Sequence, residues 1–246
     1  MKITLQKISL FLVLIFSVHN IDSVAIASRG NLPIYSKPAT IVKEPSNNSI
    51  SSSLYTSINL KAAGLNENIF NLALKGFSKL RHKGLITSDS ILTIIDYTKS
   101  AKEKRLFVID LKKQELKFNT IVAHGKESGE EYARSFSNVN ESNKSSLGFF
   151  ITKNTYEGAN GYSLKLEGAE PGFNDNAMKR AIVMHGADYV NESVLYRRGI
   201  PGRSLGCPAI PERLTKKIID KIKNGNALFT YYPDKKYLFR SKLIKD

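Results

Sequence analysis

The chain of 246 residues contains no tryptophan and only one cysteine, Cys207. One cysteine cannot form an internal disulfide, so a fold held together by disulfides is excluded. An unpaired cysteine indicates either an intermolecular bridge or a reactive thiol. The hydrophobic fraction of 41%, with 12 Phe and 11 Tyr, is ordinary for a globular protein and excludes a wholly disordered chain.

Long hydrophobic runs are also scarce, and the strongest one stands near the N-terminus. Residues 8–18, "ISLFLVLIFSV", form an apolar run of eleven residues after two lysines. A membrane-spanning helix needs about 20 residues, so this run is too short to cross a bilayer. Ala25 and Ala27 then give the small-residue pattern at which signal peptidase cleaves. We predict a signal peptide over residues 1–27 and export to the periplasm or cell envelope, with membrane contact only during export. The alternative is an uncleaved N-terminal anchor.

Acidic residues are too few to balance the basic ones, and the formal net charge is +15. Removing residues 1–27 takes away two lysines and one aspartate, which leaves a charge of +14. A charge of this size attracts polyanions. Because an exported protein rarely meets nucleic acid, we expect anionic envelope polymers as partners and no nucleic acid. The alternative is a solvated basic surface without a specific ligand.

The chain divides into four predicted segments. After the signal peptide, residues 28–60 are rich in Ser, Asn and Pro and predict a flexible linker. Residues 61–90 predict a helical segment with Asn66 or Asn68 as its N-terminal cap. Residues 91–240 predict a β-rich catalytic domain with a helix after the cysteine. The predicted fold class is therefore mostly β, of the α+β type. Its strands are expected in "ILTIIDYT", "RLFVIDL", "ELKFNTIVAHG", "SLGFFITKNTYEG", "GYSLKLEG", "RAIVMHGADYV" and "ALFTYYP".

The surroundings of Cys207 favour a reactive thiol over a structural one. Gly206 and Pro208 flank it and disfavour a helix, and a residue before proline is pushed toward extended geometry. A structural cysteine more often occupies an apolar periodic stretch, as a small hydrophobic residue. We therefore predict that Cys207 lies on a loop or at a strand end, where its side chain can reach a substrate.

A cysteine nucleophile commonly has a histidine nearby that takes up its proton. Of the four histidines, His19 belongs to the signal peptide and His82 to the basic last turn of the predicted helix. His124 in "IVAHGK" and His185 in "IVMHGA" each follow a strand pattern and precede glycine. We predict His185, 22 residues before Cys207, as the partner of the thiol.

The segments "HGADYV" and "GRSLGCPAI" resemble the signature of the YkuD-type murein L,D-transpeptidase catalytic-domain family. The similarity continues in order through "VAHGKESG", "SSLGFF", "YEGANGYSLKLEG" and "GFNDNA" and covers roughly residues 65–235. The resemblance implies an enzyme without a metal or cofactor that acts on peptidoglycan stem tetrapeptides outside the cytoplasm. It implies Cys207 as nucleophile, His185 as general base, a thioester acyl-enzyme and 3→3 cross-links.

Within this scheme we assign further roles close to the cysteine. The N–H groups of Gly206 and Cys207 are predicted to form the oxyanion hole. Ser204 is predicted to orient His185 through its carbonyl or hydroxyl oxygen.

Substrate contacts are predicted at two more positions. Arg203 is expected to hold a substrate carboxylate, and His124 is expected to line the cleft. Many YkuD-type enzymes carry arginine two residues after the cysteine, whereas this chain has Ala209, as in the branch with the Ser-x-Gly-Cys-Pro-Ala motif. That difference leaves open how the substrate carboxylate is bound.

Three other functions remain open from the sequence. Water as acceptor would give an L,D-carboxypeptidase or endopeptidase. Cys207, His185 and His124 together would offer three ligands for a catalytic zinc ion. A non-catalytic, basic cell-wall-binding protein would also fit the charge. A papain-like protease is disfavoured because its cysteine precedes its histidine in the chain.

Overall fold

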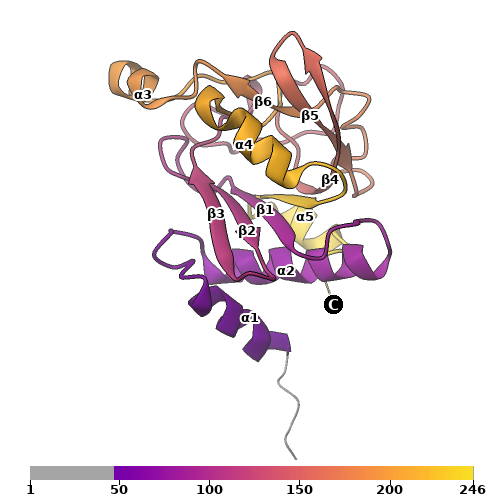
Figure 1. Cartoon of the computed structure of the whole chain (residues 1–246). Helices are drawn as coiled ribbons and strands as arrows, with labels where there is room; N and C mark the ends of the chain where they lie inside the picture. Colours follow the sequence, from indigo (N-terminus) through magenta and orange to yellow (C-terminus); the bar gives the residue numbers. More distant parts are fainter. Residues whose placement is uncertain (1–46, 246) are drawn as a thin grey trace, which may run out of the picture. The chain divides into compact units, whose positions relative to one another are not determined.

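The computed structural model describes residues 47–245, and these belong to one compact unit (Figure 1). The predicted signal peptide and the first part of the predicted linker lie outside the described residues. The elements are α1 (Asn47–Ser57), α2 (Glu67–His82), β1 (Ile91–Asp96), β2 (Leu106–Asp110), β3 (Glu115–Thr120), the 3₁₀ turn η1 (Lys126–Ser128), β4 (Gly148–Gly158), β5 (Gly161–Gly168), β6 (Val183–Ala187), α3 (Glu192–Arg198), β7 (Ala209–Pro211), α4 (Glu212–Ile222), β8 (Ala227–Tyr231) and α5 (Lys235–Arg240).

The eight strands form one mixed sheet in the order β3-β2-β1-β8-β4-β5-β6-β7. The pairs β1–β8 and β6–β7 are parallel, and the other neighbours are antiparallel. The segment after β3 bends toward the far edge of the sheet, where Ala123 bridges Ala209 of β7. The sheet is therefore nearly closed, and the predicted α+β fold class is confirmed.

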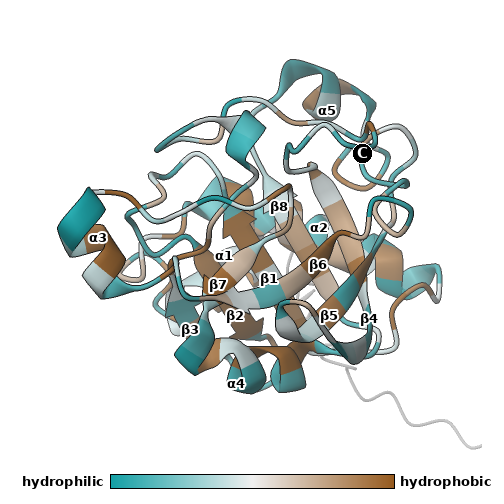
Figure 2. Cartoon of the chain, turned by 90° about the horizontal axis from the view of Figure 1, so that it is seen from above, coloured by the Kyte–Doolittle hydropathy of each residue, from teal (hydrophilic) through white to brown (hydrophobic). Residues whose placement is uncertain are grey.

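The core lies between the sheet and the helices that cover it. Every residue of β1 and β2 is buried, which explains why both strands read as continuous apolar runs instead of alternating patterns. In Figure 1, α2 lies below β1 to β3. Gly76 of α2 permits a close approach, because a Cβ there would lie 2.0 Å from the Phe149 ring. Figure 2 shows hydrophobic residues on the central strands and alternating character along α4.

The start of α2 follows the sequence prediction. Asn66 has extended backbone geometry, and its side-chain oxygen accepts a hydrogen bond of 2.9 Å from the Asn68 N–H. This bond satisfies one of the amide groups that have no partner inside the helix. Asn66, and not Asn68, is therefore the N-terminal cap. His82 ends the helix in a basic last turn, as predicted.

The linker predicted for residues 28–60 is wrong in its last part, because α1 occupies residues 47–57. This helix has little apolar periodicity and is held by contacts to its neighbours. The Tyr55 hydroxyl donates to the Leu65 carbonyl (2.6 Å), and the Ser52 hydroxyl donates to Glu67 at the start of α2 (2.7 Å). Such tertiary contacts override a local sequence pattern.

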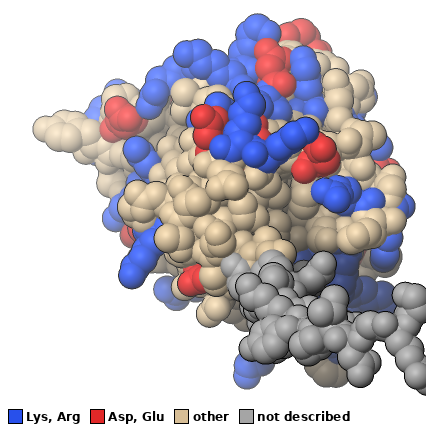
Figure 3. Space-filling model, turned by 60° about the horizontal axis from the view of Figure 1, so that its bottom comes forward, with Lys and Arg blue, Asp and Glu red and all other residues tan. Residues whose placement is uncertain are grey.

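The described surface is basic and carries no membrane-crossing helix. Within residues 47–245, no helix is both long and apolar enough to span a bilayer. On the face shown in Figure 3, Lys and Arg outnumber Asp and Glu, and the two signs are interspersed. Ion pairs between described residues include Lys221–Asp110 at 3.3 Å.

Asn66→Ala removes the cap of α2 and is expected to lower the free energy of unfolding by about 1 kcal/mol. Asn68→Ala is the matched control, because its exposed side chain makes no capping bond. Urea unfolding followed by circular dichroism measures both. Equal losses in the two variants would contradict the assignment of Asn66 as the cap.

Candidate active site

The parallel pair β6–β7 brings the two main predicted residues to one edge of the sheet. His185 of β6 pairs in register with Ala209 of β7, and its N–H donates to the Pro208 carbonyl (3.4 Å). Continuing this register by two residues sets Cys207 beside Val183. Side chains two apart in a strand share a face, so Val183 and His185 point to the same side of β6.

The thiol of Cys207 is partly exposed and fixed by two backbone contacts. Its Sγ accepts a hydrogen bond from the Val183 N–H at 3.4 Å and donates to the Ala181 carbonyl at 3.7 Å. Burial raises the pKa of the Cys207 thiol, while the Val183 N–H and the positive charge of Arg180 act in the opposite direction. The resting thiol is thus protonated at neutral pH and needs a base to react.

The His185 side chain is 4% exposed and is held in one tautomer. Its Nδ1 lies 2.8 Å from the Gly186 carbonyl oxygen. Because a carbonyl oxygen can only accept, Nδ1 carries the proton and Nε2 carries the free lone pair. An imidazole in this tautomer can accept a proton at Nε2, which is what a general base requires.

Ser204 shapes the loop that carries the cysteine. Its hydroxyl donates to the Cys207 carbonyl (2.6 Å) and accepts from the Gly206 N–H (3.1 Å). Its own carbonyl accepts from the Lys126 N–H (2.8 Å). Among residues 47–245 Ser204 makes no hydrogen bond to His185, whose Nδ1 is bonded to the Gly186 carbonyl instead, so the structure does not place Ser204 in the predicted orienting role.

Gly206 does not supply the predicted oxyanion-hole N–H, because a hydrogen bond to Ser204 already occupies it. Its N–H is already bonded to Ser204, so it is not aimed at an oxyanion. Within the described part of the chain the Cys207 N–H makes no hydrogen bond, and it remains available. Gly206 has φ of +125°, and a Cβ there would lie 2.9 Å from the Lys144 carbonyl oxygen. Glycine is therefore required at this turn.

Arg203 lies on the exposed side of the loop. Its Nη1 donates to the Gly129 carbonyl (3.1 Å) and lies 3.7 Å from a carboxylate oxygen of Glu130. About a third of the side chain, 32%, is exposed. Binding of a substrate carboxylate by Arg203 stays a prediction.

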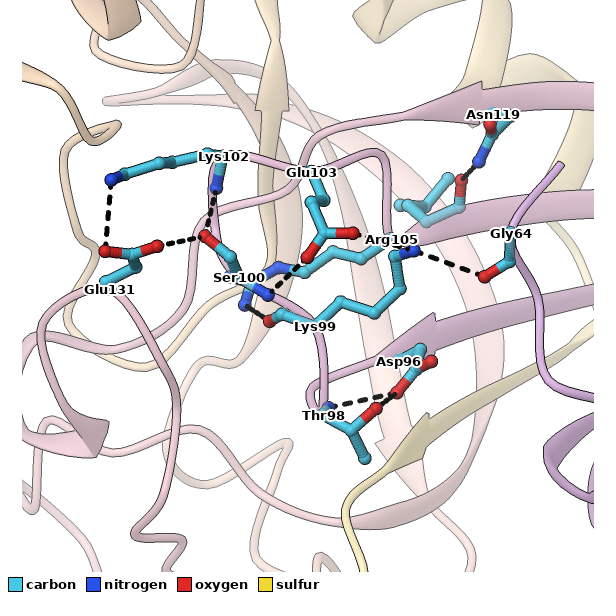
Figure 4. A network of polar contacts seen from close by, with 11 residues as sticks. Gly64, Asp96, Thr98, Lys99, Ser100, Lys102, Glu103, Arg105, Asn119 and Glu131 are labelled. Atoms are coloured by element: carbon cyan, nitrogen blue, oxygen red, sulfur yellow. Dashed lines mark hydrogen bonds and ion pairs between the residues drawn. The ribbon is translucent and has the colours of Figure 1, made fainter.

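His124 is fully buried, and the prediction that it lines the cleft is wrong. Its Nε2–H donates to the Gly129 carbonyl (3.1 Å), and its Nδ1 accepts from Nη2 of Arg105 (2.8 Å). Burial and the nearby Arg105 charge lower the pKa of His124 to about 4, so it is neutral. Figure 4 shows the Arg105 side chain among Lys99, Ser100 and Glu103.

The zinc alternative does not fit this arrangement. Both ring nitrogens of His124 already have hydrogen-bond partners, so neither lone pair is free for a metal. Among residues 47–245, no group of three His, Cys, Asp or Glu side chains could hold a metal ion.

Sequence reasoning missed two side chains near the thiol. The charge of Arg180 lowers the pKa of Cys207, and burial together with the Cys207 charge raises the pKa of Tyr189 to about 12. Tyr189 packs on Gly202, where a Cβ would lie 2.6 Å from the tyrosine Cβ. Both residues belong to the segment "RAIVMHGADY" around His185, but the sequence does not reveal where their side chains point.

A separate hollow lies away from this site. It has a volume of about 1030 Å³ and is lined by parts of α1 and α2 together with Leu111 and Lys112. Neither Cys207 nor His185 lines it, so its size does not bear on the chemistry of the thiol.

Comparison with solved structures gives distant similarities. An L,D-transpeptidase from Mycobacterium smegmatis is 12% identical, with a TM-score of 0.36, and the match covers 58% of this chain and 59% of that one. The helical cell shape determining protein Pgp2 from Campylobacter jejuni is 13% identical, with a TM-score of 0.41, covering 70% and 56%. An Enterococcus faecium L,D-transpeptidase mutant is 13% identical, with a TM-score of 0.36, covering 58% and 50%. The chain thus spans between half and three fifths of these proteins.

No curated protein matches the chain. Because each TM-score lies below 0.5, the solved structures do not establish the family. A family model does, since the L,D-transpeptidase catalytic domain model matches residues 61–231, more than half of the sequence. The chain therefore belongs to the L,D-transpeptidase catalytic domain family.

Proposed function

We propose that this protein is an exported L,D-transpeptidase that acts on peptidoglycan stem tetrapeptides through a thioester on Cys207. One observation carries the proposal: the only thiol of the chain lies beside Val183 of β6, two residues along the strand from His185, and within residues 47–245 the Nε2 of His185 has no hydrogen-bond partner. Membership of a family that acts on peptidoglycan supports the choice of substrate.

The first half of the reaction forms the acyl-enzyme. His185 takes the thiol proton at Nε2 while Sγ of Cys207 attacks the carbonyl carbon of the residue that precedes the terminal D-alanine. The carbonyl electrons move onto oxygen, and the available Cys207 N–H donates to that oxyanion. One such donor typically contributes about 3 kcal/mol to the transition state. The intermediate collapses to a thioester as the peptide C–N bond breaks, and His185 returns its proton to the departing D-alanine amine.

The second half transfers the acyl group. An amine from another stem peptide attacks the thioester carbonyl, loses a proton to His185 and forms the 3→3 cross-link. The thiolate leaves and is protonated, which restores the resting enzyme. Water in place of the amine would give carboxypeptidase activity with the same residues.

Arg203 and the basic surface supply the proposed binding contacts. The exposed part of the Arg203 side chain can bind the D-alanine carboxylate. The net charge of +15 supports an association with anionic envelope polymers. Cleavage after Ala27 and residence in the periplasm or cell envelope belong to the same proposal.

Incubating the protein with a purified stem tetrapeptide is expected to give free D-alanine and a Cys207 thioester that adds the mass of the tripeptide less one water. His185→Ala should slow adduct formation by about 10²- to 10⁴-fold, because no base then takes the thiol proton. Intact-protein mass spectrometry and a D-alanine assay measure both products.

Cys207→Ala is the control, and no adduct should form on it. Cross-linked dimers in the product mixture would support transpeptidation, whereas free tripeptide alone would favour carboxypeptidase activity. Turnover that persists in Cys207→Ala would refute the thioester route.

Gly206→Ala removes no functional group, but it should displace the loop that carries Cys207 and so reduce the reactivity of the thiol. Its positive φ and the nearby Lys144 carbonyl force the loop to move, with a backbone cost of roughly 1–3 kcal/mol. We expect adduct formation to slow by about 10-fold or more, since small misplacements of a nucleophile reduce the rate strongly.

Gly161→Ala is the matched control. Gly161 also has positive φ (66°), but it lies in the β4–β5 turn with no atom within 4 Å of an added Cβ. It should lose stability without a comparable loss of Cys207 reactivity. Similar loss of reactivity in both variants would show that general destabilisation, and not the loop, is responsible.

A further inference from the structure

Arg180 lies close to the Cys207 loop both along the chain and through space. Along the chain it directly precedes Ala181, whose carbonyl accepts the Cys207 thiol hydrogen bond (3.7 Å). Through space, its Nη2 lies 3.3 Å from the position that a Cβ on Gly206 would take. The guanidinium therefore borders the cysteine loop at Gly206, the residue just before the nucleophile.

The guanidinium is held rigidly by neutral acceptors. Nη1 donates to the Ser137 carbonyl (2.7 Å) and the Ser146 hydroxyl (2.5 Å), and Nη2 donates to the Lys144 carbonyl (2.7 Å) and the Ser142 hydroxyl (3.2 Å). Four bonds of this kind fix a planar group in one position. The segment 137–146 that supplies them is thereby tied to the start of β6.

No carboxylate neutralises this charge among residues 47–245, because none of the ion pairs there includes Arg180. The side chain is half-buried, and burial lowers its pKa while a negative charge on Cys207 raises it. An unneutralised cation in a partly water-free site acts strongly on a neighbouring anion.

Two phenols near Cys207 also carry no charge at neutral pH. Tyr97 and Tyr189 have raised pKa values, to about 12 for Tyr189, so both phenols are protonated. His185 lies on the adjacent strand in the tautomer described above. Arg180 is thus the cation whose charge lowers the pKa of the thiol.

We propose that Arg180 is a positioning residue, whose fixed guanidinium stabilises the Cys207 thiolate and ties the segment 137–146 to the nucleophile loop. The proposal deepens and rests on the proposed function, in which the same thiolate forms the acyl-enzyme. Arg180 does not need to touch the substrate for this role.

The test measures the thiol directly, as the rate of Cys207 alkylation by iodoacetamide against pH in the otherwise unaltered protein. The chain has a single cysteine, so the rate reports one site. Arg180→Gln should raise the midpoint of the profile by about 1 pH unit, because an opposite charge at this range shifts a pKa by that order. The thiolate fraction at neutral pH should fall about 10-fold. Arg180→Lys keeps the positive charge, so the midpoint of its pH profile should stay close to that of the parent protein.

Lys179→Gln is the matched control, since it removes an equal charge from the exposed neighbouring residue. Its midpoint should equal that of the parent protein. An unchanged midpoint in a folded Arg180→Gln variant, with its melting curve as the check on folding, would overturn the proposal.

A second variant covers the case in which Arg180→Gln does not fold. Ser142→Asp places a carboxylate where the Ser142 hydroxyl meets Nη2, so it neutralises the guanidinium without removing it. Its midpoint should also rise, whereas Asn140→Asp, an equal charge at an exposed position of the same segment, should leave the midpoint in place. Equal midpoints in these two variants would contradict the proposal.

Tetrapeptide turnover, measured in the same preparations, separates this inference from the proposed function. Alkylation needs no peptidoglycan, so a raised midpoint supports the role of Arg180 even if the parent protein releases no D-alanine. Absence of turnover would count against the proposed function alone.

Discussion

The site depends on a short backbone ladder that closes the sheet. The Ala123 N–H donates to the Ala209 carbonyl (2.8 Å), the Ser204 N–H donates to the His124 carbonyl (2.9 Å), and the Lys126 N–H donates to the Ser204 carbonyl (2.8 Å). These bonds attach the loop that carries Cys207 to the segment 123–126. The pairing of β7 with β6 attaches the same loop to β6. The cysteine loop is therefore held between β6 and the segment 123–126, which come from distant parts of the sequence.

A buried cation supports this ladder from behind. Arg105 is fully buried and donates twice to the Val122 carbonyl (3.1 and 2.8 Å), once to the Lys99 carbonyl (3.0 Å) and once to His124. A buried charge persists only when it has hydrogen-bond partners, and these four bonds engage all three nitrogens of the guanidinium. Burial and the neighbouring Arg105 charge together keep His124 neutral. Arg105 thus stabilises the scaffold, while Arg180 places its charge at the thiol.

The sequence was most informative where a pattern repeats along one element. Helical spacing and the Asn66 cap located α2, and β-branched apolar runs located the strands, because these signals depend on neighbours in the chain. Elimination among four histidines left His124 and His185, and the resemblance carried by the motif around Cys207 assigned His185 to the thiol. The failures all involve tertiary contacts. The last part of the 28–60 segment becomes helical through bonds to Leu65 and Glu67, and His124 is buried by Arg105. The Ser204 hydroxyl bonds to Cys207 and Gly206 in its own loop, and the Arg180 guanidinium lies beside Gly206. None of these directions is encoded in local spacing.

The partial burial of the thiol has a consequence for how the proposed reaction is controlled. Because burial raises its pKa, the resting sulfur is protonated, and oxidation or alkylation, which require the thiolate, are slowed. The Val183 N–H and Arg180 act against burial and keep the thiolate accessible when His185 removes the proton. Loss of the Val183 hydrogen bond or of the Arg180 charge would raise the pKa of the thiol further and reduce its thiolate fraction, whereas less burial would lower that pKa. The thiolate fraction of the only cysteine of this chain therefore depends on the balance between its desolvation and one fixed cation.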